Sequence, residues 1–260
     1  IEDAIKAGAS KIYSENPYPH PIVEALGNKA RKKMAEMASE NFGHPTHALK
    51  MIGVTGTSGK TTTTYLIHHI LNSTGHPCAR IGTNGTAFNG IETETANTTP
   101  DALLLQSYFA DVKKQGATHV VMEVSSHALD QDRVWGIAWD AVTFLNLSPE
   151  HMDYHPTLDH YFETKAQLFG PHVIYSLSNG KVTKLSANGS NTYGLKLSKQ
   201  NETIQVYSTA KSIRDLKTTP SGIEAKVFLK DVTHPEGQWL HLYCPLYGDF
   251  QIENILSVPV

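Results

Sequence analysis

The strongest chemical signal in the sequence is a glycine-rich turn that joins an apolar strand to a helix. The turn reads Gly53-Val54-Thr55-Gly56-Thr57-Ser58-Gly59-Lys60-Thr61. Glycines in such a turn let backbone N–H groups face an anion, the helix N-terminus adds a positive end, a lysine reaches the outer phosphates and a threonine hydroxyl holds Mg²⁺. Val54 stands where the general eight-residue motif requires glycine, so the segment fits the shorter Gly-Thr-x-Gly-Lys-Thr form. A tight connection without a ligand is the structural alternative, but the Lys-Thr pair at the required offset favours a nucleotide phosphate site.

Further polar residues follow the expected strands later in the chain. Glu123 comes directly after an apolar run, where the carboxyl ends of parallel strands bind ligands, so its carboxylate is placed to reach a metal ion beside phosphates. A helix-capping or solvated acid is the structural alternative for Glu123.

A cluster of histidines is the next candidate. His151, Asp153 and His155 lie within five residues, but this spacing fits no helical zinc face and no cysteine is near. We therefore expect His151 to hold Mg²⁺ or Mn²⁺ rather than zinc, with a surface histidine as the alternative. The hydroxyl-rich turn at residues 96–101 either caps a helix or donates to an anionic substrate.

Alternating strands and helices must position these segments. We expect strands at 51–54, 78–81, 118–122 and 141–145, and helices at 60–73, 101–115 and 158–169. Near-continuous apolar strands between helices predict an α/β fold with a mostly parallel sheet that is covered on both faces. In the helix at 101–115, Leu104, Tyr108 and Val112 share one face.

The two ends of the chain read differently. The pattern of residues 1–46 predicts a helix, a short strand and a second helix. Nothing in this segment resembles a catalytic or binding motif. After Gly170, short alternating runs at 203–207 and 225–229 and Asn-Gly turns at 179–180 and 188–189 predict a small antiparallel region. A helix-like run begins at Gln251 without a stop signal, so we expect the sequence to be a piece of something longer.

Composition excludes several classes of protein. The chain has 260 residues, of which 40% are hydrophobic and 18% are charged, which excludes disordered, collagenous and coiled-coil chains. A net charge of −3 argues against a nucleic-acid binder that works by bulk electrostatics. No apolar stretch approaches the roughly 18 residues of a membrane span and no signal peptide is visible, so we expect a soluble, cytoplasmic protein. Cys78 and Cys244 are too few for a disulfide scaffold or a Cys-built zinc site.

Taken in order, these segments resemble the central domain of the Mur ligases, the ATP-dependent enzymes that build the peptidoglycan precursor peptide. The markers lie at residues 56–61, 97–101, 121–129 with Arg133, 146–155 and 165–169. They resemble most the subgroup that adds the third residue of that peptide. By the same resemblance, residues 1–46 are a remnant of the N-terminal UDP-substrate-binding domain and residues 47–260 are the central ATP-binding domain. The resemblance also leads us to expect that the C-terminal amino-acid-binding domain is absent from this sequence.

The resemblance implies a role for each matching residue. The implied ATP contacts are Gly56, Thr57, Ser58, Gly59, Lys60, Thr61, Thr62 and, at the adenine, Asn254. The implied ligands of Mg²⁺ or Mn²⁺ are Thr61, Glu123, His151 and Lys165. The implied contacts of the UDP-N-acetylmuramoyl dipeptide are Thr98, Thr99, Ser125, Gln131 and Arg133. The residues implied in catalysis are Lys60, Lys165, His151 and Glu123. Lys165 matches a carbamylated lysine, whose carbamate holds a metal ion that an ammonium would repel; an exposed helix lysine is the alternative.

The reaction implied is ATP-dependent amide formation through an acyl phosphate, with diaminopimelate or lysine as the free amino acid. We expect the protein to be a monomer.

The sequence departs from the pattern of the Mur ligases at three places. Ser58 replaces the usual asparagine of the phosphate loop, Gln251 replaces the first asparagine of the adenine segment at 248–254, and no Asn-x-Asp-Asp strand is recognisable between residues 170 and 189. A folylpolyglutamate synthetase-like ligase and a non-catalytic Mur-like nucleotide-binding module are the alternatives.

Overall fold

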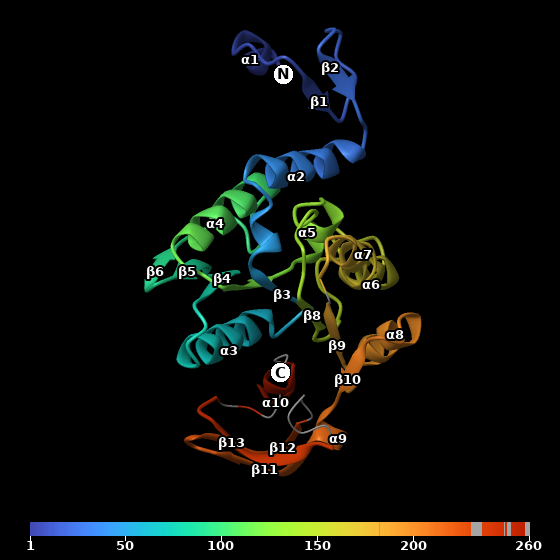
Figure 1. Cartoon of the computed structure of the whole chain (residues 1–260). Helices are drawn as coiled ribbons and strands as arrows, with labels where there is room; N and C mark the ends of the chain where they lie inside the picture. The colour runs from blue at the N-terminus through green and yellow to red at the C-terminus, as the bar shows by residue number, and fades with distance from the viewer. Residues whose placement is uncertain (182, 230–235, 247, 249–250, 258–260) are drawn as a thin grey trace.

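The computed structural model of the chain is built on one large sheet, and it describes residues 1–181, 183–229, 236–246, 248 and 251–257. Figure 1 shows this sheet at the centre, with strand order β10-β9-β8-β3-β7-β4-β5-β6. The bounds are β3 Lys50–Thr55, β4 Cys78–Gly82, β5 Gly85–Phe88, β6 Ile91–Thr93, β7 His119–Glu123, β8 Ala141–Phe144, β9 Lys184–Asn188 and β10 Gln205–Tyr207. Neighbours from β10 to β4 are parallel, whereas β5 and β6 continue the sheet as an antiparallel hairpin.

Helices cover both faces of the sheet. Their bounds are α3 Lys60–Ser73, α4 Ala102–Lys114, α5 Ser126–Asp130, α6 Leu158–Ala166, α7 Pro171–Ser178 and α8 Thr192–Gln200. Met51 belongs to the core beneath α4 to α8, and its neighbour Ile52 belongs to the core beneath α3. Because successive side chains of a strand point to opposite faces, a strand that is buried on both faces is apolar throughout. This explains the continuous apolar runs of the sequence.

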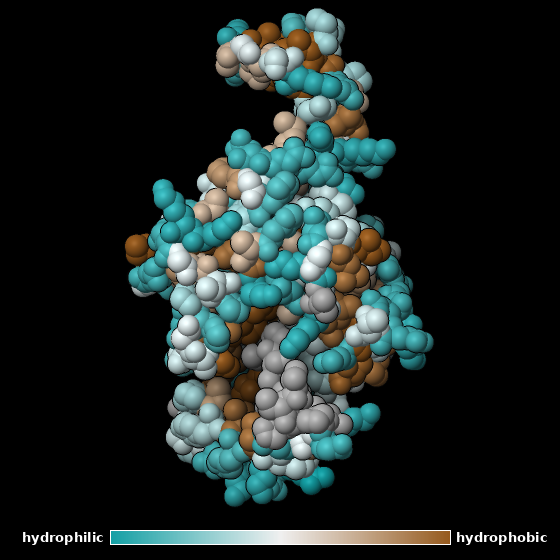
Figure 2. Space-filling view, in the orientation of Figure 1, coloured by the Kyte–Doolittle hydropathy of each residue, from teal (hydrophilic) through white to brown (hydrophobic). Residues whose placement is uncertain are grey.

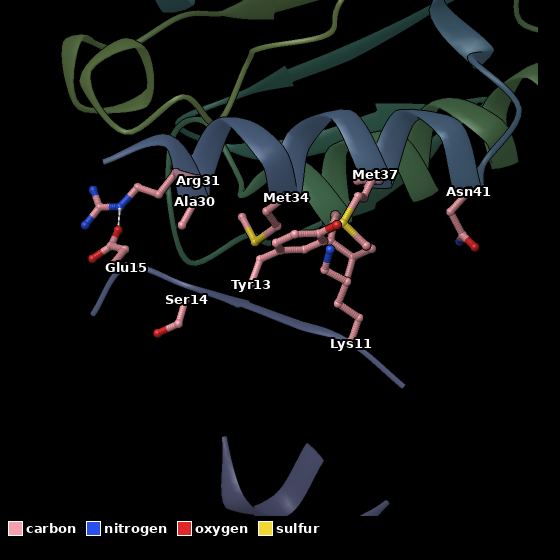
Figure 3. A pocket seen from close by; sticks show the side chains of 11 residues that line it. Lys11, Tyr13, Ser14, Glu15, Ala30, Arg31, Met34, Met37 and Asn41 are labelled. Atoms are coloured by element: carbon pink, nitrogen blue, oxygen red, sulfur yellow. Dashed lines mark hydrogen bonds and ion pairs between the residues drawn. The ribbon is translucent and has the colours of Figure 1, made fainter. Parts of the chain in front are cut away.

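The N-terminal segment lies apart from the large sheet (Figure 1). It consists of α1 Glu2–Lys6 and a parallel pair, β1 Ile12–Ser14 and β2 Val23–Ala25. Helix α2 (Lys29–Asn41) joins it to the body by packing on α4, and the short helix η1 (Pro45–His47) leads into β3. Figure 3 shows Tyr13 of β1 facing Met34 and Met37 of α2, with an ion pair between Arg31 and Glu15.

The C-terminal part adds a second, antiparallel sheet. After α9 (Thr209–Ser212) come β11 Ile213–Thr219, β12 Gly222–Leu229 and β13 Gln238–Cys244, and then α10 (Gln251–Leu256), which packs on α3. Figure 2 shows apolar side chains in the hollow between this sheet and the body, where α3, β13 and α10 line a cavity of about 700 Å³. Among the described residues, no helix combines the length and the apolar character that a bilayer crossing needs.

The predicted fold class is confirmed, but two details of the prediction are wrong. Leu104 is 60% exposed, because Leu105, Phe109 and Val112 form the buried face of α4. The run at 203–207 contains β10, which pairs in parallel with β9; this strand looks alternating because it stands at an open edge of the sheet. The antiparallel sheet therefore begins only at β11. The strand between residues 170 and 189 is β9, whose sequence Lys-Leu-Ser-Ala-Asn lacks the Asn-x-Asp-Asp motif, and the hairpin β5–β6 was not predicted.

Candidate active site

The phosphate loop lies between β3 and α3, as the sequence predicts. Gly59 is the N-cap of α3 with φ +87°, a conformation that side chains disfavour. A Cβ on Gly56 would lie 2.9 Å from the Cβ of Leu145, so this position has room for glycine alone. The N–H groups in the first turn of α3 have no acceptor within the helix and remain available to an anion. The loop therefore has the shape and the donors of a phosphate cradle.

Asn146, which follows the end of β8, holds this loop in place. Its carbonyl oxygen accepts from the Thr57 N–H (3.0 Å), and its Oδ1 accepts from the Ser58 N–H (2.9 Å). Its Nδ2 donates to the Ser58 carbonyl (3.1 Å). Because the two contacts to Ser58 use only its main chain, serine serves here as well as the asparagine that is usual in the family that the sequence resembles.

Two lysine side chains meet at one carbonyl of the loop. The Lys60 Nζ donates to the carbonyl oxygens of Gly56 (2.9 Å) and Thr57 (2.7 Å), and the Lys165 Nζ donates to the same Gly56 oxygen (3.0 Å). Lys165 is 1% exposed, which overturns the alternative of an exposed helix lysine. Among the described residues, no carboxylate forms an ion pair with either lysine. In the described part of the chain, neither amine therefore has a carboxylate counter-ion in contact with it.

Burial lowers the pKa of both amines. It lowers the pKa of Lys165 well below the ordinary 10.5, and the charge of Lys60 acts in the same direction. Burial also lowers the pKa of Lys60, while the carboxylates of Glu123 and Glu150 oppose that change. Lys165 is therefore the more readily neutralised of the two amines.

The predicted metal ligands do not form a closed cage. Glu123 is fully buried, and its Oε1 and Oε2 accept from the N–H (2.9 Å) and the hydroxyl (3.2 Å) of Thr83. His151 is solvent-accessible, and its ring meets those of His127 and Tyr161 edge-on. Within the described residues, no three His, Cys, Asp or Glu side chains are grouped to hold a metal ion. Such an open arrangement suits Mg²⁺, which binds through one or two carboxylates together with phosphates and water, better than zinc.

The predicted substrate residues are joined by hydrogen bonds. The Thr99 hydroxyl donates to the Glu123 carbonyl (2.9 Å) and accepts from the Ser125 N–H (3.1 Å). The Arg133 Nη1 donates to the Thr99 carbonyl (3.0 Å), and its Nε and Nη2 donate to Oε1 of Gln131 (3.0 and 2.6 Å). Ser125 also caps α5, since its Oγ accepts from the Ala128 N–H (3.2 Å). The structure thus brings the threonine turn, Ser125 and Arg133 to one edge of the sheet.

Asn254 reaches the phosphate loop from α10. It is 6% exposed, and its Oδ1 lies 2.3 Å from where a Cβ of Gly59 would stand. Its Nδ2 donates to Oε1 of Gln251 (2.8 Å), so glutamine at that position supports the asparagine side chain. Asp249 and Phe250 of the predicted adenine segment lie outside the described residues.

Sequence reasoning missed several residues of the site. The Tyr161 hydroxyl is 3.4 Å from the Thr57 hydroxyl, and its ring lies 4.6 Å from the Lys165 Nζ; its position one helical turn before Lys165 was the available signal. Asn146 and Glu150 lie in the motif at residues 146–155, but the sequence alone assigned no role to either of them. Thr83 carried no signal, because a lone threonine after a strand is unremarkable.

Comparison with known proteins identifies the architecture. A model described as the Mur ligase middle domain matches residues 54–259. The chain belongs to the Mur ligase family. Among the Mur ligases, it is 34% identical to a UDP-N-acetylmuramoyl-L-alanyl-D-glutamate--2,6-diaminopimelate ligase of Listeria monocytogenes over 98% of the chain and 51% of the relative. It is 36% identical to UDP-N-acetylmuramyl-tripeptide synthetase 2 of Oceanobacillus iheyensis over 99% of the chain and 52% of the relative.

Solved structures agree with this assignment. A structure of a UDP-N-acetylmuramoyl-L-alanyl-D-glutamate--2,6-diaminopimelate ligase has a TM-score of 0.81 and 30% identity, over 99% of this chain and 52% of that one. A folylpolyglutamate synthase of Mycobacterium tuberculosis has a TM-score of 0.60 at 13% identity, over 87% of this chain and 57% of that one, and shares the fold alone. The chain spans about half the length of the Mur ligases it matches.

Proposed function

We propose that this chain is the ATP-binding part of a ligase that adds the third amino acid to UDP-N-acetylmuramoyl-L-alanyl-D-glutamate. The names of the relatives support the substrate, and diaminopimelate is the amino acid that most of those names give. The observation that carries the proposal is the pair of amines on the Gly56 carbonyl, Lys60 and Lys165, which have no ion-pair partner among the residues that the structure describes. Residues 1–46 then belong to the UDP-substrate domain, and the reaction takes place in the cytoplasm, where ATP is available.

The reaction proposed has two steps. The γ-carboxylate of the substrate attacks the γ-phosphorus of ATP, so that a new C–O–P linkage forms as the bond to ADP breaks. The amine of the incoming amino acid then attacks the acyl carbon, loses a proton and displaces inorganic phosphate. Both steps gather negative charge, which preorganised donors stabilise best. Lys60 and the N-terminal turn of α3 supply those donors here.

The metal ion proposed for this site fits the residues present. When it is bound, Mg²⁺ supplies positive charge to the phosphates. Thr61, Glu123 and His151 are the side chains that would hold it, together with Lys165 in carbamylated form. An unmodified lysine ammonium cannot serve as a ligand, whereas a carbamate is an anion.

The structure supplies a chemical reason for carbamylation of Lys165. A neutral amine attacks CO₂ and releases a proton as the N–C bond forms, and burial lowers the pKa of this amine strongly. We expect ¹³C-bicarbonate to give a carbamate resonance that is absent from Lys165→Ala, and we expect short carboxylic acids to restore activity to that variant. If neither the resonance nor the rescue is observed, Lys165 is structural.

The main test is Lys60→Ala in the intact enzyme, with phosphate release followed in the presence of ATP, UDP-muramoyl dipeptide and candidate amino acids. We expect turnover to fall at least about a hundredfold, because the charge on the transferred phosphoryl group loses its main donor, while the melting temperature stays within a few degrees. Lys199→Ala, at an exposed position of α8, is the matched control. Near-normal turnover of Lys60→Ala would contradict the proposal. The absence of turnover in the unmodified enzyme, with ATP bound, would indicate a non-catalytic nucleotide-binding module.

A further inference from the structure

A two-residue turn at the end of β4 holds the buried carboxylate of Glu123. Strands β4 and β7 are parallel neighbours, and Ile81 pairs with Met122, so the next residues, Gly82 and Glu123, face each other. Thr83 then contacts both carboxylate oxygens, with its N–H on Oε1 (2.9 Å) and its hydroxyl on Oε2 (3.2 Å). Two hydrogen bonds from one residue fix the position of the carboxylate and its rotation about the last side-chain bond.

Gly82 provides the space that this arrangement needs. A Cβ on Gly82 would lie 2.1 Å from Oε1 of Glu123 and 2.8 Å from its Cδ. Gly82 is not among the glycines with positive φ, so its backbone would accept alanine. The obstacle to a side chain at this position is the Glu123 carboxylate itself.

Thr83 also connects the carboxylate to the threonine turn. Its Oγ1 lies 3.2 Å from Oγ1 of Thr98. Because the Thr83 hydroxyl donates its one hydrogen to Glu123, it accepts from Thr98. Thr99 meanwhile donates to the main-chain carbonyl of Glu123 (2.9 Å). The turn proposed to bind the UDP-linked substrate is thus connected to Glu123 in two ways. Thr98 reaches the Glu123 carboxylate through Thr83, and Thr99 bonds to the Glu123 backbone.

We propose that Thr83 is a positioning residue that orients the Glu123 carboxylate for the metal–nucleotide complex and couples it to Thr98, and that Gly82 leaves the space for this orientation. This inference rests on the proposed function, in which Glu123 holds Mg²⁺. The Thr83 side chain is exposed, and its hydroxyl bonds only to Thr98 and Glu123 among the described residues. Its loss should therefore leave the fold intact and act on the site.

The test compares Thr83→Val, which removes the hydroxyl but keeps the shape, with Thr83→Ser, which keeps the hydroxyl. Binding of Mn²⁺ in the presence of a nonhydrolysable ATP analogue is measured by electron paramagnetic resonance, alongside the melting temperature. We expect the Mn²⁺ affinity to fall about tenfold in Thr83→Val and to stay within about twofold in Thr83→Ser, since residues that orient metal ligands usually contribute about 10–100-fold. Gly82→Ala should lose at least as much as Thr83→Val. Gly170→Ala, with no atom within 4 Å of the added carbon, is its control.

Glu123→Gln separates this inference from the proposed function. If Glu123→Gln loses Mn²⁺ affinity and Thr83→Val does not, the positioning role is wrong while the metal assignment stands. Equal losses in Thr83→Val and Thr83→Ser would also overturn the role, because the hydroxyl would then be irrelevant. If Glu123→Gln itself binds Mn²⁺ normally, the metal assignment fails and the inference fails with it.

Discussion

Acid should destabilise this protein through His172, a buried histidine that is not among the proposed site residues. His172 is 2% exposed on α7, and its ring meets the Trp135 ring edge-on at 5.2 Å. Burial lowers its pKa from 6.5 to about 4, and the charge of Lys32 acts in the same direction. Between these two pKa values the unfolded chain binds a proton that the folded chain excludes. Stability therefore falls as the pH drops through this window.

The size of the effect follows from the two pKa values. Relative to pH 8, excluding the proton lowers the free energy of unfolding by about 2 kcal/mol at pH 5 and about 3 kcal/mol at pH 4. We expect urea unfolding at pH 8 and pH 5 to show a loss about 2 kcal/mol larger in the unmodified protein than in His172→Phe. Because each protein is compared with itself, any cost of the phenylalanine cancels. A difference below about 0.5 kcal/mol between the two losses would refute the reasoning, since it would show that His172 is protonated in the fold or that its pKa is ordinary.

Two further substitutions test the proposed site. Gly59→Ala forces a side chain into a conformation with φ +87° and against the Asn254 amide, so we expect ATP affinity, measured by calorimetry, to fall at least about tenfold; unchanged affinity would show that the loop does not hold the nucleotide. Arg133→Lys keeps the charge but loses the forked donors that hold Gln131 and the Thr99 carbonyl, so we expect KM for the UDP-linked substrate to rise about tenfold with little change in KM for ATP. An equal rise in both KM values would instead indicate general damage.

The best-predicted part of the fold is the unit from β3 to α3. Its helix runs from Lys60 to Ser73, as the sequence indicates, because the Lys-Thr start and the glycine at its end are local signals. The hairpin β5–β6 escaped prediction because its strands are only four and three residues long. The face of α4 was misjudged because Leu104 and Leu105 are equally apolar, and only the packing decides which one is buried.

The site could be predicted where its residues lie within one motif, and not where the fold alone brings residues together. Lys60 was recognisable from its own turn. The contact between Thr83 and Glu123 joins residues 40 positions apart, and it exists only because β4 lies beside β7. The meeting of Lys60 and Lys165 at one carbonyl likewise depends on how α6 packs against the end of β3. Resemblance to a family names such residues, but the contacts that set their protonation are properties of the folded chain.

The charge balance between the two lysines shows why their roles should differ. Both nitrogens lie within 3.0 Å of the Gly56 oxygen, so they are at most about 6 Å apart, and two positive charges at that distance repel by about 3 kcal/mol. The repulsion disappears if Lys165 becomes neutral, and it turns into attraction if Lys165 is carbamylated. Lys60 is the better candidate to keep its charge, since it has a second carbonyl acceptor in Thr57 and the carboxylates of Glu123 and Glu150 raise its pKa. The fold thus favours the positive charge on Lys60, at the helix N-terminus proposed to bind phosphates, over the positive charge on Lys165.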